Sequence, residues 1–75
     1  MKPLSKIEIG KCCRVVGIEG QPDLCQRLME MGICEGDKVS VVRKAPLGDP
    51  TEYHFGCNRI SLRQVEASAI LVEPT

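Results

Sequence analysis

The side chains with the greatest potential for chemistry are the single histidine and the five cysteines. His54 and Cys57 form an H-x-x-C spacing, and imidazole and thiolate are the ligands that zinc and iron favour. These two residues are the candidate ligands of an Fe²⁺ or Zn²⁺ ion. Against a metal, no C-x-x-C pair exists, and Cys12 and Cys13 on a strand would point to opposite faces. Reduced cysteines are also often buried as small apolar residues. The sequence favours that interpretation, and we therefore expect no cofactor.

Catalytic chemistry has little support in this sequence. His54 has no serine in an elbow motif to act on, and neither a phosphate-binding loop nor a glycine-rich dinucleotide motif is present. A small chain also has little room for the deep concave pocket that a substrate needs. We therefore expect that the protein is not an enzyme.

Length and charge restrict the remaining functions. The 75 residues suffice for one domain, spanning residues 1–75. Ten acidic and ten basic residues balance, so no electrostatic footprint for nucleic acid is present. The first residues are charged and contain no long apolar stretch, which predicts neither a signal peptide nor membrane insertion. We expect a cytoplasmic protein whose cysteines stay reduced.

Short β-branched runs separated by turn residues predict a mostly β domain with one short helix. Gly17 inside the first run indicates a bulge, and in the second run Val42 begins a shift of the apolar face. Closely spaced turns favour a small antiparallel β-barrel. The predicted strands cover residues 11–18, 38–44, 51–55, 59–62 and 69–72.

The predicted helix begins near Pro22 and Asp23, which suit a first turn. Leu24, Leu28 and Met31 share one face of it, and we expect Met31 in the core. Gly32 is the expected left-handed residue at its end, with Ile33 contacting Leu28.

A second, shorter helical segment is predicted near the end of the chain. Ser61 and Gln64 have the spacing of a capping box, so residues 62–68 should form about one helical turn.

The segment "APLGDP", residues 45–50, raises a separate question. Its prolines, glycine and aspartate are typical turn residues, whereas Leu47 at its centre is large and apolar. Leu47 either folds back beneath the loop or is an exposed anchor whose presentation the prolines make less costly in entropy.

The stretch "RLMEMGICEGDKVSVVRKAPLGDPTEYHFGCNRISLRQVEASAILV", preceded by "IEIGKCCRVVGIEG", resembles the ferrous iron transport protein A (FeoA) family. The resemblance covers nearly the whole chain. The sequence departs from the family pattern at Glu35, where a proline often precedes the glycine, and in its five cysteines.

The resemblance implies an SH3-like β-barrel with an inserted helix. It also implies a cytosolic accessory protein for ferrous iron uptake, which binds the membrane iron transporter bearing a GTPase domain (FeoB). The same domain occurs in iron-dependent repressors, so a metal-responsive (Fe²⁺ or Zn²⁺) regulatory module is the alternative. Self-association through strand edges or an apolar patch is a third interpretation.

The predicted partner-binding surface joins the helix edge to the loop tip. A rigid apolar anchor with charged neighbours is a plausible small hot spot. The candidate residues are Arg27, Met29, Leu47, Asp49 and Arg63.

Overall fold

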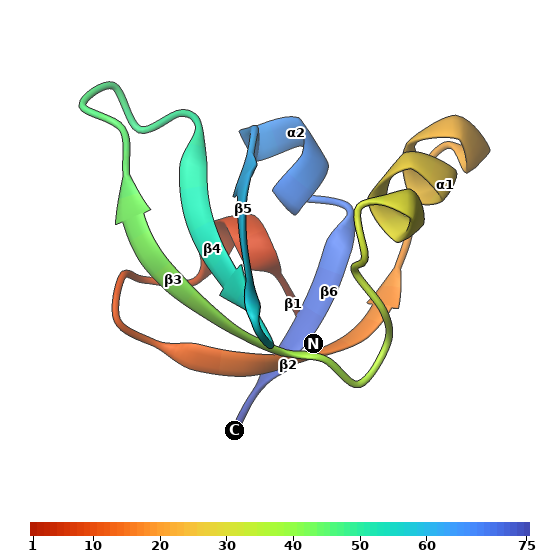
Figure 1. The fold of residues 1–75 in the computed structure, drawn as a ribbon, viewed down its shortest axis with the longest axis horizontal. Coiled ribbons are helices and arrows are strands. Elements are labelled where there is room, and N and C mark those ends of the chain that lie inside the picture. The colour runs from red at the N-terminus through yellow and green to blue at the C-terminus, as the bar shows by residue number, and fades with distance from the viewer.

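The computed structural model describes all 75 residues as a strongly bent sheet with short helices around it (Figure 1). In chain order the elements are β1 (Lys2–Pro3), the 3-10 helix η1 (Leu4–Lys6), β2 (Cys12–Ile18), α1 (Pro22–Glu30), β3 (Lys38–Lys44), β4 (Thr51–Phe55), β5 (Asn58–Leu62), α2 (Gln64–Ala67) and β6 (Ile70–Pro74). The prediction of a mostly β fold is confirmed. The structure has two α-helices, where the sequence predicted one helix and one further helical turn.

All strand pairs are antiparallel, in the order β1-β6-β2-β3-β4-β5. The predicted barrel closure is absent from this hydrogen-bonding pattern, because the two edge strands, β1 and β5, do not pair with each other. The two short helices η1 and α2 lie against one another, and the hydroxyls of Ser5 and Ser68 are 3.0 Å apart. No helix is long and apolar enough to cross a membrane.

Two irregularities in strand pairing accompany the bend of the sheet. The β2–β6 register shifts between Val15 and Gly17, and the β3–β4 register shifts between Val41 and Arg43. Each bulge adds a residue to one strand and increases its local twist. The predicted bulge beside Gly17 and the change of face at Val42 are thus confirmed.

One apolar cluster fills the inside of the bent sheet. Cys13 is buried while its neighbour Cys12 is exposed, as expected for alternating strand residues. The ring centroids of Tyr53 and Phe55 lie 6.1 Å apart within the cluster. Its members are Leu4, Cys13, Val15, Leu28, Ile33, Val39, Val41, Tyr53, Phe55, Leu62, Ala67, Ala69, Ile70 and Val72.

The end of α1 has the predicted geometry. Gly32 has φ +96°, its N–H donates to the Met29 carbonyl at 3.0 Å, and the Ile33 N–H donates to the Leu28 carbonyl at 3.3 Å. This pair of bonds is the Schellman motif, and both Leu28 and Ile33 are buried. The prediction for Met31 is wrong: this residue is 37% exposed, because the helix ends there and Ile33, two residues further on, enters the core in its place.

The predicted capping box of α2 is also wrong. Strand β5 continues to Leu62, whose burial fixes the chain as extended beyond Ser61. Arg63 is the residue before the helix, and its N–H donates to Oε1 of Glu66 at 2.8 Å. The helix therefore begins two residues later than the box formed by Ser61 and Gln64 requires.

Truncating Leu28 to alanine should lower the free energy of unfolding by about 2–5 kcal/mol, because a cavity remains in the core. The neighbouring change Met29→Ala is the matched control. That side chain is 64% exposed, and we expect a change within about 0.5 kcal/mol. Urea denaturation followed by far-UV circular dichroism measures both. Equal effects would contradict the assigned orientation of α1.

Candidate partner-binding surface

The loop between β3 and β4 is an ordered turn that presents Leu47 to solvent. The Gly48 N–H donates to the Ala45 carbonyl at 2.7 Å, and the Ala45 N–H donates to the Pro50 carbonyl at 3.0 Å. Pro46 occupies the second turn position, which suits its fixed φ, and Gly48 follows with φ +84°. Leu47 is 96% exposed. It does not fold back beneath the loop. Its placement is that of the exposed side chain that was the alternative in the sequence analysis.

Asp49 ties the base of this loop to α2. Its Oδ1 accepts a hydrogen bond from the Gln64 N–H at 2.8 Å. Gln64 is the first residue of the helix, where backbone donors lack a partner within the helix itself. Asp49, predicted to bind a partner, therefore also caps α2 across the fold and fixes the loop beside it.

An ion pair continues the connection from α2 to α1. Arg27 Nη2 lies 3.7 Å from Glu66 Oε2, while the other Glu66 oxygen accepts from the Arg63 backbone. The Arg27 side chain is largely exposed, so the pair contributes little to stability. The ion pair places the Arg27 guanidinium beside α2.

The five predicted residues lie in the 45–50 loop, in α1 and directly before α2. In Figure 1 the loop and α1 are at opposite ends of the upper side, with α2 between them and both chain ends below. Hydrogen bonding and the ion pair link these three elements in that order. We call this region the loop–helix surface. It comprises Arg27, Met29, Leu47, Asp49, Arg63 and Val65.

Val65 was missed by the sequence reasoning. It is 71% exposed on α2, next to the residue that Asp49 caps. A four-residue helix has too few turns for a periodic pattern to distinguish its exposed Val65 from its buried Ala67. At the far end of the surface, Met29 lines a shallow groove on α1 with Pro22, Cys25, Gln26 and Glu30.

The predicted metal ligands lie elsewhere. His54 is exposed on β4 and lines a small depression on the outer face of the sheet with Cys12 and Ser40, its neighbours on β2 and β3. Cys57 is exposed in the turn between β4 and β5. No group of three or more histidine, cysteine or acidic side chains is positioned to hold a metal ion. Two donors do not make a closed zinc site, which takes four.

The bent six-stranded antiparallel sheet with short helices around it defines a small, mostly β domain. A family model, described as the FeoA domain, matches residues 2–74. The chain therefore belongs to the FeoA family, as the sequence resemblance indicated.

Among relatives, the chain is 37% identical over 70 residues to the Fe(2+) transport protein A/Fe(2+) transporter FeoB fusion protein of Porphyromonas gingivalis. The match covers 93% of this chain and 8% of that protein, so the chain spans a small part of its relative.

Among solved structures, the FeoA-like protein of Clostridium acetobutylicum superposes with a TM-score of 0.91 at 36% identity, over 97% of this chain and 85% of that one. FeoA of Stenotrophomonas maltophilia, a procaryotic SH3 domain protein complexed with zinc, has a TM-score of 0.81 at 30% identity. That match covers 93% of this chain and 87% of the other. A manganese-dependent transcriptional repressor has a TM-score of 0.89 over 99% of this chain and 41% of that one. Because its sequence is only 17% identical, the similarity shows a shared fold alone.

Replacing Asp49 by alanine should lower the free energy of unfolding by about 1 kcal/mol, the usual cost of losing a cap. It should also speed hydrogen exchange at the Gln64 amide, because that N–H loses its acceptor. Asp49→Asn is the control, since it keeps an oxygen at Oδ1. Two-dimensional NMR exchange measures both variants. Unchanged protection of Gln64 in Asp49→Ala would mean that the cap is not formed.

Proposed function

We propose that this protein is a cytoplasmic accessory protein for ferrous iron uptake that binds the GTPase-bearing membrane transporter FeoB. One observation carries the proposal: in the Porphyromonas gingivalis relative, the matching segment belongs to a single protein named for both FeoA and FeoB. Covalent fusion keeps two domains at high effective concentration, which benefits domains that act on one another. Ferrous iron is the cargo of the transporter.

The loop–helix surface is the docking site in this proposal. Leu47 is a large apolar group held on a turn with two prolines, so its immobilisation costs little entropy on binding. Val65 and Met29 add apolar area along the same side, and Arg27 and Arg63 supply charge at its edges. An apolar anchor with polar neighbours is a common arrangement of a binding hot spot.

Docking can regulate transport without any chemistry in this domain. A bound protein shifts a conformational equilibrium when its affinity differs between the two states. The accessory domain therefore needs only to bind one transporter conformation more tightly than the other.

The change Leu47→Asp should weaken binding to the cognate transporter at least tenfold, because it replaces the exposed apolar anchor of the loop by a charge. Ile9→Asp is the matched control: Ile9 is 54% exposed and lies in the connection before β2, outside the loop–helix surface. Co-purification with the transporter in detergent and a titration of Kd measure both. Retained binding by Leu47→Asp, with its circular dichroism unchanged, would remove the loop from the interface.

Self-association through the same surface is the competing use of Leu47. Sedimentation of the protein alone separates the two uses. A dimer that Leu47→Asp dissociates would assign the surface to a second copy.

A metal-responsive module is the second candidate function. It is supported by the zinc complex of the Stenotrophomonas maltophilia relative. In this chain, however, His54 and Cys57 do not fit a complete site, because no third ligand joins them.

Under the docking proposal, His54→Ala and treatment with a chelator should leave transporter binding unchanged. Under the metal-responsive alternative, the isolated protein should bind one Fe²⁺ or Zn²⁺ in anaerobic titration, and His54→Ala should remove that binding. Absorbance in the thiolate charge-transfer region, recorded with the binding assay, decides between the two.

A further inference from the structure

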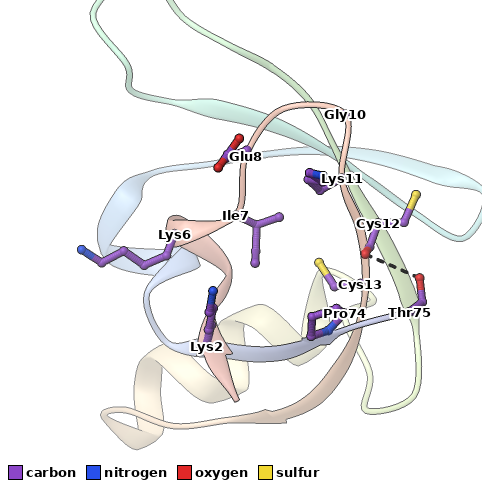
Figure 2. A pocket seen from close by; sticks show the side chains of 10 residues that line it. All are labelled: Lys2, Lys6, Ile7, Glu8, Gly10, Lys11, Cys12, Cys13, Pro74 and Thr75. Carbon is purple, nitrogen blue, oxygen red and sulfur yellow. Dashed lines mark hydrogen bonds between the residues drawn. The ribbon is translucent and has the colours of Figure 1, made fainter.

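A second surface feature lies outside the loop–helix surface. The segment that follows η1, the start of β2 and the end of β6 enclose a pocket of about 420 Å³ (Figure 2). We call it the lysine pocket. Its lining consists of Lys2, Lys6, Ile7, Glu8, Gly10, Lys11, Cys12, Cys13, Pro74 and Thr75.

The charge of this pocket differs from that of the rest of the molecule. Three lysines and one glutamate give its lining a formal charge of +2. Because the formal net charge of the whole chain is zero, all the other side chains together carry a charge of −2. The ion pairs of the structure all use arginines, so Lys2, Lys6 and Lys11 have no acidic partner within the protein.

The centre of the pocket is uncharged. The side chains of Ile7 and Cys13 face its interior, with Pro74 beside them, while Cys12 points away (Figure 2). Burial raises the pKa of the Cys13 thiol, and the adjacent Cys12 raises it further. The thiol is therefore protonated at neutral pH and acts as an apolar group.

We propose that the lysine pocket binds an acidic segment of a partner protein, with one apolar side chain over Ile7 and Pro74 and flanking carboxylates near the lysines. A small apolar area surrounded by cationic side chains complements that combination. Glu8 opposes it from the same lining. This site is independent of the loop–helix surface and does not require the proposed docking to FeoB.

The test uses the purified full chain and a short fluorescein-labelled peptide in which one leucine is flanked on both sides by glutamates. Fluorescence anisotropy should show saturable binding that weakens with added salt, because ions screen exposed charges over about 10 Å at 0.1 M. A peptide with glutamine in place of glutamate, and one with alanine in place of leucine, should bind more weakly. Equal binding of the glutamine peptide, or no binding of the glutamate peptide, overturns the proposal.

Variants of the chain locate the binding. Lys11→Glu should weaken binding of the glutamate peptide roughly fivefold, which is the size of effect that exposed charge pairs produce. Glu8→Lys should strengthen binding of the same peptide. Lys44→Glu, which makes the same change of net charge outside the pocket, should have no effect. Circular dichroism confirms that each variant is folded. A Lys44→Glu effect as large as that of Lys11→Glu would show general charge attraction and overturn the site.

Discussion

The whole structure depends on burying one small aliphatic cluster with a single sheet. A chain of this length has no second layer of sheet to cover its core, so the sheet must curve around the cluster. The bulges in β2 and β3 accompany this curvature. The edge strands β1 and β5 do not pair with each other, and η1 and α2 add Leu4 and Ala67 to the cluster.

The same constraint explains why α1 is held by so few side chains. Leu28 and Ile33 reach the cluster through the Schellman turn, and Leu24 packs at its margin. The remaining apolar side chains near the end of the helix, Met29 and Met31, stay exposed because the core is already closed beneath them. A small core thus leaves apolar groups on the surface, where they are available for binding.

The accuracy of the sequence interpretation follows the distance over which each interaction acts. Local features were predicted well: glycine at the end of α1, the bulge beside Gly17 and the opposite orientations of Cys12 and Cys13 each depend on a few neighbouring residues. The start of α2 was misplaced, because the burial of Leu62 in the sheet overrode the local capping pattern. The cap from Asp49 to Gln64 joins residues fifteen positions apart, and no local pattern contains it. The lysine pocket likewise combines residues from both ends of the chain.

The cap from Asp49 gives the apolar loop a fixed place relative to the helices. Without it, Leu47 would be carried by a turn whose only internal bonds join its own backbone, and its position relative to Val65 and Arg27 would vary. With it, the turn, the short helix and the Arg27–Glu66 pair form a connected series along one side of the sheet. Such a preorganised surface lowers the cost of recognising a partner, because each group that is already fixed need not be ordered on binding.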